Sequence, residues 1–249
     1  MQLNILGSSS SGNFYLLKSN SGQILMLECG VLINEIKVGI NFNFYNVVGC
    51  LLSHEHGDHA KSHETLMRYG VDLYTSAGTA RALAISVDNH RLKKIAANDI
   101  LTIGEFRILA FKVEHDCAEP LGFIINHPES GNILFITDSF YVSNTFKNIH
   151  NIMIEANFSD AIVKERMANG YLPDYRANRL FKSHMSLETC IKTLQANDLS
   201  QVQKIILLHL SDGNSNAEYF KNEVIKATGK PVTIADKGVK IEHFNQEPF

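Results

Sequence analysis

Residues 46–59 have the sequence NVVGCLLSHEHGDH and form the most informative segment of the chain. Residues 46–53 are a nearly continuous apolar run, which is typical of a strand buried on both faces. His54-Glu55-His56-Gly57-Asp58-His59 follows directly, where that strand is expected to pass into a loop. Three histidines and one aspartate at this point predict a metal site rather than an ordinary polar turn.

The spacing of these ligands predicts two cations side by side. In extended chain, alternate residues point the same way, so His54 and His56 can face one cation together. Asp58 and His59 come one turn later and can face a second cation. Gly57 is expected to let the backbone bend between the two pairs. Imidazole and carboxylate ligands suit zinc or manganese, with iron as an alternative, and do not suit a soft-metal thiolate site.

The remaining chain alternates between short apolar runs and helical patterns, and we interpret it as one domain over residues 1–249. Strands are expected at 2–6, 13–18, 23–28, 46–53, 100–103, 106–114, 121–127, 132–137, 152–155, 204–208, 232–235 and 239–243. Helices are expected at 32–40, Ala60–Tyr69, 77–85, within 160–196, and after a capping box at Ser215-x-x-Glu218. Strands dominate each half with helices beside them, which favours an α/β/β/α sandwich of four layers.

Composition excludes several protein classes. The 249 residues carry a net charge of −3, which excludes a strongly basic nucleic-acid coat protein. No apolar stretch is long enough for a membrane span, and the N-terminus lacks the features of a secretory signal. The four cysteines show no CxxC spacing and are expected to be reduced thiols in the cytoplasm.

The HEHGDH segment resembles the HxHxDH signature of the metallo-β-lactamase superfamily. That resemblance implies the same four-layer sandwich, with two divalent cations in a cleft at the strand ends. It also implies three further ligands, each after an apolar run: His115, Asp138 and His209. The first cation would then be held by His54, His56 and His115, and the second by Asp58, His59 and His209. Asp138 would bridge them.

Further segments resemble one bacterial branch of that superfamily, the YycJ (WalJ)-like proteins. They are Gly7–Asn13 (GSSSSGN), 115–123 (HDCAEPLGF), 136–139 (ITDS), 155–158 (EANF) and 183–186 (SHMS). The resemblance implies a nucleic-acid phosphodiesterase, specifically a 5′→3′ DNA exonuclease with a role in repair, acting on DNA rather than RNA. Two positions depart from the branch: Glu28 stands where Asp is usual, and Phe158 where His is usual.

His184 is a candidate catalytic residue that the metal ligands leave unused. Relatives that process nucleic acids have a histidine before a helix that contacts the scissile phosphate or protonates the leaving group. Ser186 is expected to cap the helix that carries Leu187, Ile191 and Leu194, so His184 would precede a helix N-terminus, where anions bind. A residue that merely begins the helix is the alternative reading.

Besides a second role for the ligand Asp58, four further side chains are expected to support the site. Glu155, aided by Asn157, is expected to orient His184, and Asp58 to help orient the nucleophile. Asn13 and Glu28 are expected to contact the metal ligands. The serine-rich turn before Asn13 either lines the cleft or serves only as a turn. The basic residues between 164 and 182 form either a solvated helix face or a track for phosphates.

Three function classes remain open from the sequence. The first is a two-metal phosphodiesterase, in which hydroxide between the metals attacks phosphorus and His184 protonates the leaving oxygen. The second keeps the hydroxide attack but acts on a small ester, thioester or cyclic nucleotide, which would not require His184 and the basic segment. The third is a metal-binding recognition module without catalysis. The oligomeric state is left open.

Overall fold

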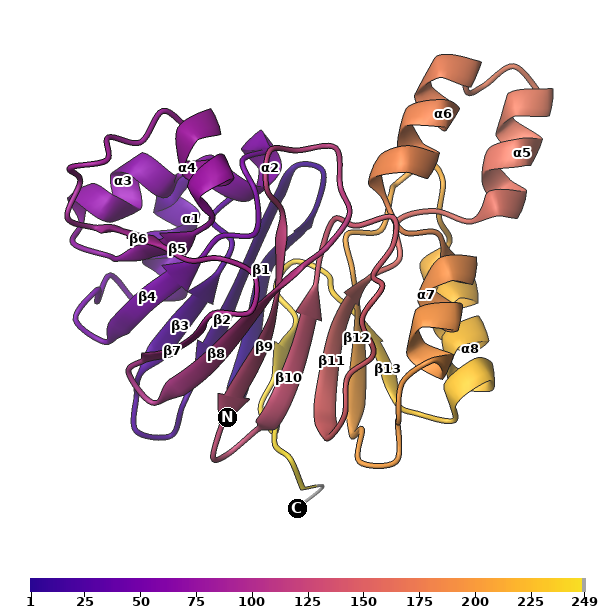
Figure 1. Cartoon of the computed structure of the whole chain (residues 1–249). Coiled ribbons are helices and arrows are strands. Elements are labelled where there is room, and N and C mark those ends of the chain that lie inside the picture. The colour runs from indigo at the N-terminus through magenta and orange to yellow at the C-terminus, as the bar shows by residue number, and fades with distance from the viewer. Residues whose placement is uncertain (248–249) are drawn as a thin grey trace.

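Two seven-stranded sheets pack face to face with helices on their outer surfaces, as Figure 1 shows. The computed structural model describes residues 1–247. The N-terminal sheet has the strand order β14-β1-β2-β3-β4-β5-β6, and the second sheet has the order β13-β12-β11-β10-β9-β8-β7. The predicted four-layer α/β/β/α sandwich is therefore confirmed.

The N-terminal sheet changes from antiparallel to parallel pairing at β3. Its strands are β1 (Gln2–Ser9), β2 (Gly12–Lys18), β3 (Ile24–Leu27), β4 (Val47–Leu51), β5 (Leu73–Thr75), β6 (Leu92–Lys94) and β14 (Lys240–Ile241). From β3 to β6 all neighbours run parallel, so β3 and β4 end at the same edge of the sheet. The sequence did not predict β5 and β6, which have three residues each and show no alternating pattern.

The second sheet is antiparallel from β7 to β10 and parallel from β10 to β13. Its strands are β7 (Ile100–Ile103), β8 (Phe106–Lys112), β9 (Leu121–His127), β10 (Gly131–Ile136), β11 (Ile149–Glu155), β12 (Lys204–Leu208) and β13 (Val232–Ile234). The carboxyl ends of β10, β11 and β12 therefore meet at one edge, where α/β sheets commonly place their ligands.

The main apolar core lies between the two sheets. Alternate residues of each strand face it: Leu3 and Ile5 of β1 and Phe135 of β10 are fully buried there. Other clusters lie under the outer helices, so both faces of β11 and β12 are covered, which explains their continuous apolar sequences. This packing holds the strand ends in fixed positions.

The helices are short. They are α1 (Ile33–Gly39), α2 (Gly57–Ala60), α3 (His63–Arg68), α4 (Ala77–Ala82), α5 (Asp160–Ala168), α6 (Asp174–Ser183), α7 (Leu187–Gln195) and α8 (Ala217–Thr228). Within residues 1–247 we find no helix with the length and apolar character needed to cross a membrane.

Two predicted helix boundaries are wrong. The helix expected over Ala60–Tyr69 is split into α2 and α3 at Ser62, because its amide donates to the carbonyl of Cys29 at 3.0 Å instead of to the preceding helical turn. The Ser62 hydroxyl also bonds outward, to the carbonyl of Val31 at 2.7 Å. The helix expected to begin with a Ser215 cap begins instead after Asn216, whose side chain accepts from the amide of Tyr219 at 2.9 Å. The Ser215 hydroxyl donates to Ser211 instead.

The segment predicted as helical over 160–196 forms three helices. Figure 1 shows that α5 and α6 rise above the sandwich as a helical hairpin, whereas α7 packs on the second sheet. Ser186 caps α7 as expected, since its Oγ accepts from the amide of Thr189 at 3.1 Å. We refer to residues 160–183, which contain α5 and α6, as the arm.

Candidate metal centre

The motif residues reach the site from the end of β4 and from α2. His54 lies beyond β4 in extended chain, and His56 immediately precedes α2. Their ring centroids are 4.7 Å apart. Asp58 and His59 lie within α2, so the change from extended chain to helix turns the second pair toward a neighbouring position. His54 and His56 therefore lie beside each other, while Asp58 and His59 follow on the adjoining helix.

One group of ligand atoms gathers around one oxygen of Asp138. Nδ1 of His56 lies 3.1 Å from Nε2 of His115. Nε2 of His54 and Nε2 of His115 lie 3.9 and 3.8 Å from Oδ2 of Asp138. The four side chains come from three loops, since His54 and His56 share the one after β4, and they can hold one cation between them.

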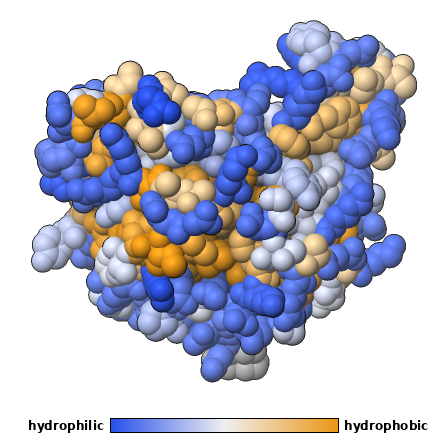
Figure 2. Space-filling view, in the orientation of Figure 1, coloured by the Kyte–Doolittle hydropathy of each residue, from blue (hydrophilic) through white to orange (hydrophobic). Residues whose placement is uncertain are grey.

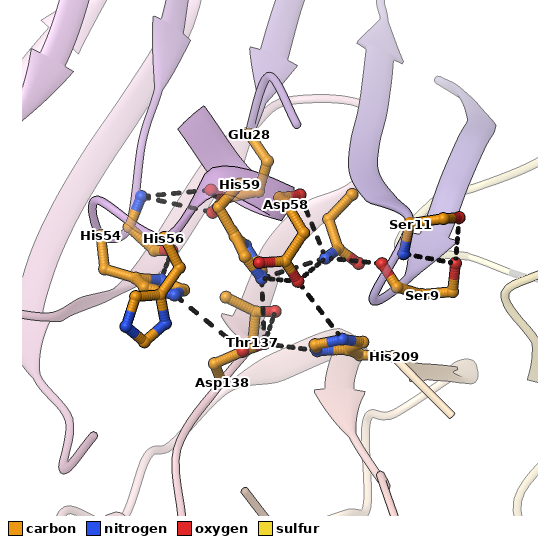
Figure 3. Close-up of polar contacts among 12 residues, drawn as sticks. Ser9, Ser11, Glu28, His54, His56, Asp58, His59, Thr137, Asp138 and His209 are labelled. Atoms are coloured by element: carbon orange, nitrogen blue, oxygen red, sulfur yellow. Dashed lines mark hydrogen bonds and ion pairs between the residues drawn. The ribbon is translucent and has the colours of Figure 1, made fainter. Parts of the chain in front are cut away.

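A second group gathers around the other oxygen of the same carboxylate. Oδ1 of Asp138 lies 3.2 Å from Nε2 of His59 and 2.6 Å from Nδ1 of His209. Oδ2 of Asp58 lies 3.6 Å from Nε2 of His209. These four residues can also hold a cation. Asp138 thus stands between both groups, as Figure 3 shows for His54, His59 and His209.

Two buried histidine nitrogens that lack hydrogen-bond partners within residues 1–247 indicate that these side chains suit metal ions. Nε2 of His54 and Nε2 of His209 are buried and have no hydrogen-bond partner among the described residues. An unpartnered polar atom in the interior costs about 1–3 kcal/mol. Both nitrogens point into a carboxylate-containing cluster, where a cation would satisfy them. His and Asp groups of this kind are able to bind metal ions.

Burial and neighbouring charges shift the pKa values of several groups in the cluster. Burial and the nearby His59 hold the pKa of His54 well below its usual range, which favours the neutral form that metals bind. Burial opposes ionisation of Asp138, but His209 and His59 outweigh it and keep the pKa of that carboxyl well below its usual range. Burial likewise opposes protonation of His209, yet Asp138 raises its pKa to about 10.

Asn13 and Glu28 both contact His59. Nδ2 of Asn13 lies 3.0 Å from Nε2 of His59 and 3.3 Å from the carbonyl of Asp58. Glu28, which is fully buried, accepts from the amide of Ser53 at 3.3 Å, and its Oε2 lies 3.4 Å from Nδ1 of His59. Figure 3 shows Glu28 on the side of the His59 ring away from Asp138. The longer glutamate therefore still reaches the ring of His59.

His209 is held in an unusual backbone conformation. Its φ is 54°, in the left-handed region that costs a non-glycine residue about 1–2 kcal/mol. Two polar groups hold it there: Asn157 Nδ2 donates to its carbonyl at 2.8 Å, and its amide donates to Ser8 Oγ at 3.0 Å. Asn157 was expected to aid His184, but it contacts His209 instead. Ser8 of the serine-rich turn thus contacts the backbone of a candidate ligand.

The glycine that the site requires is not the one in the motif. Gly57 has open space where a Cβ would be and a φ outside the left-handed region, so the bend there does not depend on glycine. A Cβ on Gly30 would lie 1.6 Å from the carbonyl oxygen of Asp58. Gly30 therefore lets the chain after β3 lie directly against α2. Gly30 was not predicted from the sequence, although it follows Glu28 by two residues.

His184 and Glu155 form a pair beside the metal ligands. Nδ1 of His184 lies 2.6 Å from Oε1 of Glu155 and 3.6 Å from Oδ2 of Asp138. The His184 side chain is 21% exposed and Glu155 is fully buried. Burial opposes protonation of His184, but Glu155 raises its pKa. Glu155 and His184 are thus in direct contact, as orientation of the ring by Glu155 would require.

A cleft of about 530 Å³ opens over these groups. One wall contains Ser10, Gly57 and Asp58, and the opposite wall is α6 of the arm, followed by His184. Nδ1 of His115 lies 2.5 Å from the carbonyl of Ser183, which ties the last turn of α6 to a metal ligand. Substrate in this cleft would touch both the candidate metal centre and the arm.

The sequence matches a model of a known protein domain over most of its length. The model of the Beta-lactamase superfamily domain matches residues 43–210, a range that contains all seven candidate ligands. The chain belongs to the metallo-β-lactamase superfamily. It is thus a hydrolase of that superfamily, and the resemblance stated from HEHGDH is confirmed.

One similar protein sequence and two similar solved structures are consistent with this family assignment. The chain is 25% identical over 241 residues to Exodeoxyribonuclease YycJ of Bacillus anthracis, covering 90% of this chain and 88% of that protein. The fold is similar to the metallo-β-lactamase fold protein YhfI of Bacillus subtilis, with a TM-score of 0.72, 17% identity and coverage of 97% and 99% of the two chains. Human tRNase Z, short form, gives a TM-score of 0.64, 14% identity and coverage of 98% and 99%.

Proposed function

We propose that the protein is a metal-dependent phosphodiesterase that acts on nucleic acid, most simply a 5′→3′ DNA exonuclease. The observation that carries this proposal is the placement of His184, bonded to Glu155 and partly exposed, beside two ligand groups that share Asp138. The similarity to an exodeoxyribonuclease over most of both chains supports DNA as the substrate. A role in repair in the cytoplasm is part of the same proposal.

In this proposal each ligand group holds one divalent cation, zinc or manganese, with iron as the alternative. His54, His56 and His115 hold the first, Asp58, His59 and His209 hold the second, and Asp138 contacts both. When bound, such a pair of cations lowers the pKa of water and stabilises negative charge on phosphoryl oxygens. The buried unpartnered nitrogens of His54 and His209 support this assignment.

The chain's own residues supply position and a proton. Asp58, whose side chain reaches the cleft, helps to orient the nucleophile toward phosphorus. His184 donates a proton to the leaving oxygen, which general acid catalysis requires for a poor leaving group. Glu155 holds the His184 ring at 2.6 Å and so acts as a positioning residue.

Digestion of end-labelled linear double-stranded DNA by the purified protein in Mn²⁺ tests this proposal, with Asp58→Ala run in parallel. A ladder that shortens from the 5′ end and disappears in the variant supports it. Cleavage of RNA but not DNA would change the assigned substrate from DNA to RNA. Absence of cleavage of either polymer, in protein that binds metal and hydrolyses a small ester, would replace the nuclease assignment by the small-substrate one.

A further inference from the structure

The arm carries positive charge that the remainder of the chain lacks. Residues 160–183 contain five lysines and arginines and three acidic residues, a net charge of +2. The whole chain has a net charge of −3, so the remainder has −5. Since phosphate-binding proteins neutralise the substrate backbone with lysine and arginine, the arm is where a nucleic-acid strand would be attracted.

The arm has its own apolar base. A small cluster separate from the main cores joins α5 to α6, and its members are Phe158, Val163, Ala177, Met167, Leu172 and Leu180. Phe158, the position where the branch usually has His, is buried in it and packs edge-on against Phe181 at 5.4 Å. Figure 2 shows the arm at upper right with a mainly hydrophilic outer surface around a narrower apolar strip.

Not every basic residue of the arm is free to bind substrate. Arg166 donates to the carbonyl of Gly213 and thereby fastens α5 to the loop after β12. Lys182 is exposed on α6 but does not line the cleft. The two basic residues that line the cleft are Arg176 and Arg179.

These two arginines form a track that leads to His184. Arg176, Arg179, Leu180 and Ser183 have the spacing of one helix face, and all four line the cleft. With a rise of 1.5 Å per residue, Arg179 and Arg176 lie about 6 Å and about 10.5 Å along the helix from Ser183. A strand that places its scissile phosphate beside His184 would meet Arg179 first and Arg176 next.

The guanidinium groups of this track are placed so that they could bind an anion. Arg179 is 73% exposed and is held by Asp116 through Nε at 3.4 Å. Among the described residues no hydrogen bond is made by its terminal nitrogens, which are the atoms that grip a phosphate in a fork. Arg176 lies against the ring of Tyr175, with its guanidinium carbon 5.9 Å from the ring centroid.

Exposed aromatic residues accompany the arginines. Tyr175 is 69% exposed and lies one helical turn before Arg179, and Tyr171 just before α6 is 74% exposed. Large exposed aromatic rings beside a basic track are the combination by which proteins bind unpaired strands, because any base can stack on them. The cleft holds about 530 Å³, which is within the range of small-molecule pockets and is enough for one unpaired strand to enter.

We propose that the arm binds a single strand next to the scissile phosphate: Arg179 and Arg176 contact successive phosphates, and Tyr175 stacks on an unpaired base. This inference rests on the proposed function and narrows its substrate to an unpaired end or a single strand. A blunt duplex would have to fray before its terminal phosphodiester could reach His184.

Fluorescence anisotropy of a labelled single-stranded oligonucleotide with cleavage-resistant phosphorothioate linkages tests this inference on the metal-loaded protein. The Arg176→Ala/Arg179→Ala variant should bind at least about tenfold more weakly. Its plot of log affinity against log salt should be shallower by about 1.4, as expected for two lost phosphate contacts on a single strand. Lys182→Ala, which removes one charge from the same helix outside the cleft, should bind as the wild type does.

Three further measurements sharpen the result. Arg176→Lys/Arg179→Lys should restore most of the salt dependence, which a folding defect would not allow. Tyr175→Ala should weaken binding of the single strand more than that of a blunt duplex. In cleavage assays, the Arg double variant should lose far more on a duplex with a single-stranded overhang than on bis-p-nitrophenyl phosphate.

The outcomes separate this inference from the proposed function. If the wild type cleaves DNA but the Arg double variant binds the single strand as well as wild type, the arm assignment is wrong and the nuclease assignment stands. The arm assignment would also be wrong if the blunt duplex and the single strand bound with equal affinity and both lost the same affinity in the Arg double variant. If binding depends on the arm but no polymer is cleaved, the nuclease assignment fails and the arm assignment stands.

Discussion

Nδ1 of His184 lies 2.6 Å from Oε1 of Glu155, and the same nitrogen lies 3.6 Å from Oδ2 of Asp138. The ring is thus fixed by a buried carboxylate on one side and open to the cleft on the other. This arrangement leaves Nε2 as the atom that can reach substrate. His184 also belongs, with Glu155, Asp138 and His209, to a group that could hold a metal ion, so a role at the leaving group and a role at the metal centre need separate tests.

If His184 is the general acid, its importance depends on the leaving group. We expect His184→Ala to lower kcat on a DNA dinucleotide by about 10²–10⁴-fold, because an alkoxide needs a proton as it departs. The loss on bis-p-nitrophenyl phosphate should be below about tenfold, since nitrophenolate leaves without one. Steady-state kinetics on both substrates provides the measurement. Equal losses would show that His184 serves the metal centre rather than the leaving group.

Glu155→Gln should reproduce this leaving-group pattern with a smaller loss. The amide keeps the size of the side chain and removes the charge that faces His184. Because Glu155 does not reach the cleft, we expect a loss in kcat on the dinucleotide with little change in KM. A rise in KM alone would assign Glu155 to substrate binding instead.

Asp138 contacts both ligand groups, so its replacement should affect both cations. We expect Asp138→Asn to reduce the bound metal toward zero, whereas His56→Ala should lower mainly one equivalent. Elemental analysis after dialysis gives the metal content per chain. Asp212→Asn removes an exposed carboxylate three residues after His209 and should leave the content unchanged. Full metal retention in Asp138→Asn would refute a shared ligand.

Two glycine variants test which backbone approach the site requires. Gly30→Ala should destabilise the fold by about 1–3 kcal/mol and lower metal content, because its Cβ would overlap the Asp58 carbonyl oxygen. Gly57→Ala, inside the HEHGDH motif, should be tolerated since nothing lies within 4 Å of its Cβ position. Chemical denaturation and metal analysis compare the two. The reverse order of sensitivity would contradict the packing described.

The backbone of His209 offers a test away from the ligand atoms. Ser8→Ala removes the hydroxyl that accepts from the His209 amide at 3.0 Å, and Asn157→Ala removes the donor to its carbonyl. Each should weaken metal binding about 10- to 100-fold by releasing the left-handed conformation. Ser9→Ala is the matched control, because the hydrogen bonds of the Ser9 hydroxyl go to Ser11. Titration with a competing chelator measures the affinity, and equal values for Ser8→Ala and Ser9→Ala would refute this role.

Some of the candidate site was predictable because its ligands follow strands that are visible as apolar runs. His54, Asp138 and His209 each come directly after or one residue beyond such a run. The alternation of side chains in extended chain was enough to pair His54 with His56. Short strands such as β5 escaped prediction, since three residues carry no pattern and the strand exists through its pairing with β4.

The sequence by itself determined the residue types, the family and the order of layers, because hydrophobic patterning and local motif spacing act over a few residues. Only the tertiary structure decided which oxygen of Asp138 faces which histidines. It also decided that Gly30 lies against Asp58, that Ser8 and Asn157 hold His209, and that α6 stands over the cleft. These relationships join residues far apart in the chain. They depend on how the two sheets pack, which no local pattern specifies.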